Sequence, residues 1–137
     1  MDDVKPFIYP GDDGSKLKPG SRYENFIGGD WSKPKSGNYF ENISPTSGKI
    51  ICEVPRSNAE DVNSALDAAH KAAEAWGKTG PALRADILLK IADRIEQNAE
   101  KLSLAETLDN GKPIREPMAA DIPCLLYTSD AADDDHC

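Results

Sequence analysis

The pattern of hydrophobic and polar positions is most regular between Pro81 and Gly111. Apolar side chains recur there every three or four residues, while charged side chains fall on the opposite side of a helical wheel. The apolar positions are Ile87, Leu88, Ile91, Ile95, Ala99, Leu102 and Ala105. The pattern predicts an amphipathic helical stretch whose apolar stripe packs against another surface.

The ends of this stretch carry recognisable signals. Thr79 can cap the helix, and Pro81 fits its first turn because the amide that proline lacks has no helical partner there. Near Asn98 the stripe changes direction, so we expect a break with Asn98 capping the second segment. Asn110 and Gly111 tolerate the left-handed conformation that ends a helix.

A second amphipathic pattern precedes the first, between Ser57 and Gly77. Ser57 and Glu60 have the spacing of a capping box, in which each side chain bonds to the other's backbone amide. Gly77 can end the helix as its left-handed residue. The apolar stripe consists of Val62, Ala65, Leu66, Ala69, Ala73 and Trp76.

Short strand patterns come before both helices. Residues 26–27 and 30–31 flank Gly28-Gly29, a pair that predicts a tight turn with positive φ. Residues 39–43 and 49–54 flank a five-residue loop rich in turn formers, which predicts a second hairpin. Residues 1–22 are rich in glycine and proline and predict an extended or mobile lead-in.

Size and charge limit the possible classes of protein. The 137 residues suffice for one domain, with 39% hydrophobic and 29% charged residues. A net charge of -8 with scattered basic residues argues against a nucleic-acid partner. No apolar run approaches the roughly 20 residues of a membrane span, and the acidic start is unlike a signal peptide, so we expect a cytoplasmic protein.

Individual reactive side chains give little sign of a site. Cys52 lies in a predicted strand without a base beside it, which favours a packed thiol over a nucleophile. His70 lies on the flank of its helix, as surface histidines usually do. His136 beside Cys137 is the one metal-like spacing, and it is incomplete. No glycine-rich phosphate-binding loop occurs in the sequence.

Five blocks in order carry a family resemblance: NFIGGDW, ENISPTSG, the capped alanine-rich helix to Trp76, RADILLKIADRIEQN and ETLDNGKP. Together they resemble the N-terminal part of the aldehyde dehydrogenase superfamily, and most closely its bacterial acetaldehyde dehydrogenases. The resemblance covers residues 23–123 and implies an α/β fold. The expected structure is the N-terminal β-hairpins and helices of the cofactor-binding domain, truncated before its Rossmann-like sheet is complete.

The resemblance implies an enzyme that uses NAD or NADP to oxidise an aldehyde to a carboxylic acid through a thioester on a cysteine. In the family the cysteine, its glutamate base and the cofactor site follow the region seen here. We therefore assign no catalytic and no cofactor-binding residue in this chain. The fragment is expected to be inactive and to bind no cofactor, whereas the full-length form is expected to be a homo-oligomer.

The resemblance also implies one metal site, for a monovalent cation near Asp109 and the backbone oxygen at Ile43. Carboxylate and carbonyl oxygens are suitable ligands for such a hard ion. The alternative is that Asp109 only braces the end of its helix beside Asn110-Gly111.

The last stretch, residues 124–137, departs from the family. Cys124 to Asp133 matches the translation of a transposon-derived sequencing adapter, so we expect a non-native tail. This divides the chain into 1–22, 23–123 and 124–137. If the tail is instead native, the alternative is a small non-catalytic helical adaptor that binds a partner through the stripe from Val62 to Trp76.

Overall fold

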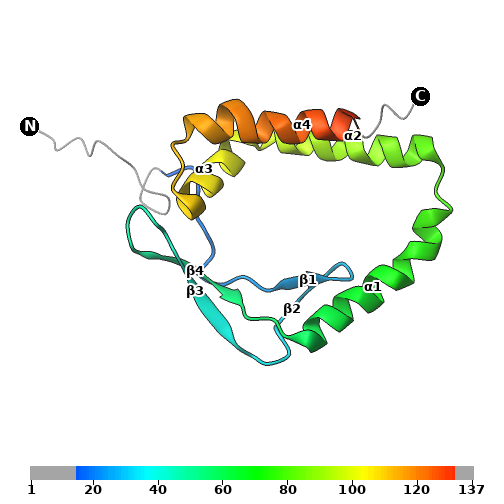
Figure 1. The fold of residues 1–137 in the computed structure, drawn as a ribbon, viewed down its shortest axis with the longest axis horizontal. Coiled ribbons are helices and arrows are strands. Elements are labelled where there is room, and N and C mark those ends of the chain that lie inside the picture. The colour runs from blue at the N-terminus through cyan, green and yellow to red at the C-terminus, as the bar shows by residue number, and fades with distance from the viewer. Residues whose placement is uncertain (1–14, 132–137) are drawn as a thin grey trace, which may run out of the picture.

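A computed structural model describes residues 15–131, with the side chains of 128–131 excepted. Two small antiparallel sheets and a series of helices surround an open centre (Figure 1). The elements are β1 (Asn25–Ile27), β2 (Asp30–Ser32), β3 (Tyr39–Ile43), β4 (Ile50–Pro55), α1 (Ala59–Gly77), α2 (Pro81–Gln97), α3 (Ala99–Asn110), the π-helix η1 (Pro117–Asp121) and α4 (Ile122–Ala131). The predicted α/β class is confirmed.

The first hairpin forms as predicted. β1 and β2 pair in antiparallel register, with Phe26 opposite Trp31. Gly28 and Gly29 have φ of 64° and 96°, the left-handed region that favours glycine. The rings of Phe26 and Trp31 lie 5.0 Å apart, which is within the range of favourable aromatic pairs.

The second hairpin pairs β3 with β4. β3 has its predicted bounds, whereas β4 begins and ends one residue later than predicted. The register shifts between Asn42 and Ile43. Beside β4, the segment around Arg22 forms a parallel bridge, in which the Tyr23 amide donates to the Glu53 carbonyl at 2.9 Å. This part of the predicted lead-in therefore joins the sheet, whereas residues 1–14 lie outside the described residues.

Both predicted end signals of α1 are wrong, the N-terminal one by a single residue. The N-cap is Asn58, whose side chain accepts from the amides of Glu60 and Asp61, and Asp61 returns a bond to the Asn58 amide. The capping box thus pairs Asn58 with Asp61 rather than Ser57 with Glu60. Gly77 lies within the helix, and the C-cap is Lys78 in a right-handed conformation.

The helical stretch from Pro81 to Gly111 breaks at Asn98, as predicted. The predicted side-chain cap there is wrong, because Asn98 Nδ2 donates back to the Arg94 carbonyl at 2.7 Å. The Thr79 cap is also wrong, since Gly80 is the N-cap and Thr79 Oγ1 bonds to Ala75. Gly111 ends α3 with φ of 80°, as predicted.

The chain then passes through η1 into α4, which packs along α2 (Figure 1). The Ile122 amide donates to the Pro117 carbonyl across the wider π-turn, and both residues are buried. Residues 124–131 of the predicted non-native tail lie in α4, and 132–137 lie outside the described residues.

The apolar core of the described part is small. Its buried apolar side chains are Leu17, Cys52 and Ile122, together with the fully buried Pro117, while many large apolar side chains on the strands and helices are exposed. None of the helices described has both the length and the apolar content to cross a bilayer.

Candidate functional site

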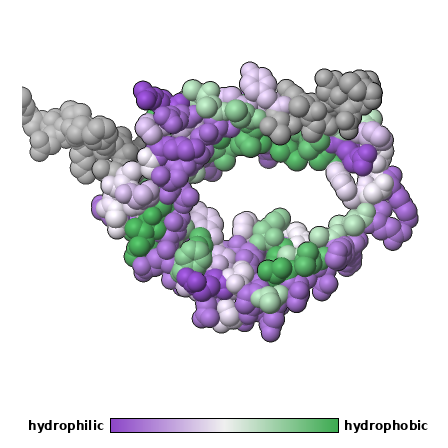
Figure 2. Space-filling view, viewed as in Figure 1, coloured by the Kyte–Doolittle hydropathy of each residue, from purple (hydrophilic) through white to green (hydrophobic). Residues whose placement is uncertain are grey.

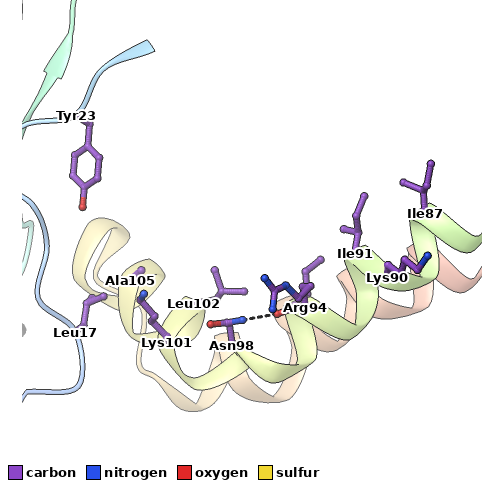
Figure 3. A pocket seen from close by; sticks show the side chains of 11 residues that line it. Leu17, Tyr23, Ile87, Lys90, Ile91, Arg94, Asn98, Lys101, Leu102 and Ala105 are labelled. Atoms are coloured by element: carbon purple, nitrogen blue, oxygen red, sulfur yellow. Dashed lines mark hydrogen bonds between the residues drawn. The ribbon is translucent and has the colours of Figure 1, made fainter. Parts of the chain in front are cut away.

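A groove along α2 and α3 has a volume of about 680 Å³. Its apolar lining consists of Leu17, Tyr23, Ile87, Ile91, Ile95, Leu102 and Ala105 (Figure 3). We call it the apolar groove. Hydrophobic residues of the upper helices gather on the side that faces the open centre (Figure 2). Ile87, Ile91, Ile95, Leu102 and Ala105 of the predicted stripe line this face, whereas Leu88 and Ala99 do not.

Two lining residues of the apolar groove, Leu17 and Tyr23, were not expected from the sequence. Each is an isolated apolar residue without helical or strand spacing. Tyr23 is held in place because its hydroxyl accepts from the Gly20 amide at 3.0 Å, while its own amide bonds to β4. Leu17 and Tyr23 could not be assigned to the groove from the sequence because the bridge beside β4 depends on tertiary pairing. No local sequence pattern predicts that bridge.

The charged side chains of the apolar groove all carry the same sign. Lys90, Arg94 and Lys101 line it, with Asn98 as the uncharged polar residue among them. Lys90 also contacts Asp86 on the next turn at 2.6 Å, as an exposed ion pair. The groove therefore combines an apolar floor with a cationic border.

The predicted cation site lies where the second hairpin meets the end of α3. Asp109 Oδ1 accepts a hydrogen bond from Asn42 Nδ2 at 2.6 Å, and Ile43 is the next residue of β3. The structure therefore brings Asp109 beside the strand that contains Ile43. The side chains of Ile43 and Asp109 are both exposed.

The donors at this position fit a cation only in part. One Asp109 oxygen is already used by the Asn42 amide, which supports the bracing alternative. Within residues 15–131, no three or more His, Cys, Asp or Glu side chains gather where they could hold a metal ion. The cation site at Ile43 and Asp109 stays a prediction, and no chemical step is derived through it.

Cys52 lies beside this junction and is packed, as predicted, with 5% of its surface exposed. Burial raises the pKa of its thiol, and the nearby charge of Asp109 raises it further, against a hydrogen bond with Asn42. A raised pKa leaves little thiolate at neutral pH, so Cys52 is poorly suited to be a nucleophile. His70 is exposed, also as expected.

A polar cluster that the sequence did not reveal joins α3 to η1. Lys112 Nζ lies 2.8 Å from Asp121 Oδ2 and 3.0 Å from Glu106 Oε1. The hydrogen bond to Asp121, followed by that to Glu106, raises the pKa of Lys112, and the same bond lowers the pKa of Asp121. These ion pairs join the last turn of α3 and η1 across the turn after Gly111.

Sequence comparison gives a consistent result. A sequence model of the aldehyde dehydrogenase family matches residues 31–133. A long-chain-aldehyde dehydrogenase of Acinetobacter sp is 56% identical over 120 residues, which is 88% of this chain and 24% of that protein. Aldehyde dehydrogenase B of Escherichia coli is 54% identical over 119 residues, 87% of this chain and 23% of that one.

Comparison with solved structures points to the same family as the sequence comparison. The apo form of an indole-3-acetaldehyde dehydrogenase has a TM-score of 0.77 at 35% identity, covering 86% of this chain and 28% of that one. An indole-3-acetaldehyde dehydrogenase in complex with NAD+ also has a TM-score of 0.77, and this chain covers 25% of that one. The present chain spans about a quarter of the length of the curated relatives it matches.

Proposed function

Because the chain belongs to the aldehyde dehydrogenase family, we propose that it is the N-terminal part of an enzyme that oxidises a small aldehyde such as acetaldehyde to the carboxylic acid. NAD or NADP is the proposed hydride acceptor, which the NAD+ complex of a structural neighbour supports. The observation that carries the proposal is the family match over residues 31–133. We further propose a cytoplasmic, homo-oligomeric complete enzyme.

The residues described here do not fit a nicotinamide cofactor. They form two separate two-stranded antiparallel sheets, whereas dinucleotides bind at the carboxyl ends of parallel strands next to a glycine-rich turn. No such turn occurs in the sequence. In this proposal the cofactor site and the catalytic residues belong to polypeptide beyond this sequence, so we derive no step of the reaction from this chain.

We propose that the 137-residue chain is itself inactive. The poor suitability of Cys52 as a nucleophile supports this. The test adds acetaldehyde with NAD, and separately with NADP, to the purified chain and follows the absorbance of the reduced cofactor. We expect no reduction above the rate without protein, and aldehyde-dependent turnover would contradict this part of the proposal.

The parent activity is tested on the longer gene product. The locus is resequenced across the codon for Pro123, and the reading frame found there is expressed. We expect reduction of NAD or NADP that depends on aldehyde and is unchanged in a Cys52→Ser variant. A longer product that folds but gives no aldehyde-dependent reduction would exclude the proposed function.

One observation favours the alternative of a binding module. On α1, Val62, Leu66 and Trp76 are 54%, 49% and 48% exposed, which is unusual for the apolar stripe of an amphipathic helix. An adaptor would use this face to bind a partner. A native stop codon after residue 137 in the genomic sequence would favour the adaptor, whereas a longer reading frame favours the enzyme.

A further inference from the structure

Asn110 and Gly111, at the end of α3, form the one Asn-Gly pair of the sequence. We propose that Asn110 is a site of spontaneous deamidation and that the hydrogen bonds at the end of α3 set the rate of this modification. The proposal assigns a covalent modification site to the chain and does not depend on the proposed function.

Deamidation requires water and no other reactant. The Gly111 nitrogen loses its proton and bonds to Cγ of Asn110, the Cγ–Nδ2 bond breaks, and Nδ2 leaves as ammonia. Water then opens the five-membered imide at either carbonyl and leaves aspartate or isoaspartate at position 110. Glycine favours the first step because no side chain hinders its nitrogen or restricts its backbone. Every other asparagine of the chain is followed by a residue with a side chain.

Three hydrogen bonds engage the reacting groups in the folded chain. The Gly111 amide donates to the Thr107 carbonyl at 3.0 Å, so the attacking nitrogen belongs to the helical ladder. Asn110 Nδ2 donates to Glu106 Oε1 at 3.2 Å, and Asn110 Oδ1 accepts from the Lys112 amide at 2.9 Å. The side chain is thus held at both of its polar atoms. Because imide closure must turn this side chain towards the Gly111 nitrogen, the end of α3 has to open first.

The observed rate is then the intrinsic chemical rate multiplied by the fraction of time for which the end of α3 is open. Helix ends open more readily than helix interiors. Asn63, by contrast, lies within α1, between its Asn58 cap and Trp76. We therefore expect Asn110 to be modified before Asn63, both because glycine follows it and because its helical turn is the last one of α3.

The modification should weaken the same turn that controls it. A carboxylate at position 110 cannot donate to Glu106, and it would lie four residues from that negative charge, where like charges destabilise a helix. Negative charge at the C-terminal end also opposes the helix dipole. Isoaspartate additionally lengthens the backbone by one methylene between Thr107 and Gly111, whose hydrogen bond ends the helix. Modified chains should accordingly melt at a lower temperature than unmodified chains.

The experiment incubates the full 137-residue chain at mildly alkaline pH, in buffer and in guanidinium chloride, and locates deamidation by peptide mapping with mass spectrometry. We expect Asn110 to be modified first and to yield both aspartate and isoaspartate. The rate in buffer should be roughly tenfold or more below the rate in guanidinium chloride, since three hydrogen bonds that each contribute about a factor of two to ten must open in the folded chain.

The test variant is Glu106→Ala, which removes the acceptor of Asn110 Nδ2. In buffer it should be deamidated roughly two- to tenfold faster than the native chain. The matched control is Glu100→Ala, which removes the same type of side chain from the first turn of α3, where Glu100 has an exposed ion pair with Lys16. Its rate should equal that of the native chain, and in guanidinium chloride all three rates should be equal.

Circular dichroism establishes that each variant keeps its helix content. If Glu106→Ala does not fold, the comparison of the native chain with and without guanidinium chloride decides alone. First modification at another asparagine, absence of modification in guanidinium chloride, or equal rates with and without guanidinium chloride would overturn the proposal. Equal rates for folded Glu106→Ala and Glu100→Ala in buffer would overturn it as well.

Discussion

Asn42 Nδ2 donates a hydrogen bond to Asp109 Oδ1 at 2.6 Å, and this bond joins β3 to the last turn of α3 across 67 residues of sequence. It links the second hairpin to the helices at the position where the resemblance placed a cation. Asp109 can therefore act as a structural brace or as a cation ligand. The two roles predict a different dependence of stability on the cations in solution.

We expect Asp109→Ala and Asn42→Ala each to lower the free energy of unfolding by about 0.5–1.5 kcal/mol, because each removes the same hydrogen bond. In a double-mutant cycle the second substitution should then cost less than it does alone. Denaturant unfolding measures the values. Equal results in potassium and in tetramethylammonium salts indicate a brace alone, whereas a loss confined to potassium would support the predicted cation.

Gly111→Ala should destabilise the chain more than Gly37→Ala does. Both glycines have positive φ, 80° and 68°, where a Cβ costs about 1–2 kcal/mol. A Cβ at Gly111 would also lie 3.1 Å from Pro45 Cγ, which adds about 1–3 kcal/mol, whereas nothing lies within 4 Å at Gly37. Thermal unfolding of the two variants compares them, and equal losses would show that the loop at Pro45 moves freely away.

Asn58→Ala should cost about 0.5–2 kcal/mol through loss of the N-cap of α1. Ser57→Ala is the matched control. Ser57 Oγ contacts only Asn25 Oδ1 among the bonds of the described residues, so its loss should be smaller. Helix content and the urea midpoint of unfolding are measured for both variants. A larger loss of stability in Ser57→Ala than in Asn58→Ala would mean that Ser57 is the cap.

Stability should fall in acid partly through Asp61. This carboxyl is 3% exposed, and the backbone amides of Asn58 and Lys35 donate to it, which lowers its pKa below the ordinary value of 3.8. A lowered folded pKa stabilises the native state above pH 3.8, and this contribution is lost as the pH falls through the folded value. Melting temperatures between pH 5 and 2 should therefore fall less steeply for Asp61→Asn than for the native chain.

Features that depend on local chemistry could be predicted from the sequence. Gly28-Gly29 fixes the first hairpin because few other residues adopt its two positive φ angles. Gly111 ends α3 for the same reason. Asn98 interrupts the helix where the apolar stripe changes direction. In each case the conformational preferences of two or three neighbouring residues account for the observed turn or helix end.

Features that depend on competition between neighbouring residues, or on partners distant in the sequence, could not be predicted from the sequence. Ser57 and Asn58 are both residue types that cap helices well, and the observed capping box uses Asp61, which also accepts from the distant Lys35 amide. Leu17 and Tyr23 reach the apolar groove only because the segment before β1 bridges to β4. Asp109 was singled out by resemblance, but its actual partner, Asn42, has no local signature in the sequence.

The π-helix η1 affects how this region tolerates changes in length. The turn closed by the hydrogen bond from the Ile122 amide to the Pro117 carbonyl contains one residue more than an ordinary α-helical turn. Removing a single alanine, Ala119 or Ala120, would therefore reduce this π-turn to an α-helical turn without rotating Ile122 away from its buried side, although Pro123, which has no amide proton, would still interrupt the hydrogen-bond ladder into α4. A one-residue insertion elsewhere in the same helix would turn that side outward by about 100°. Length variation among related chains should accordingly concentrate at this turn.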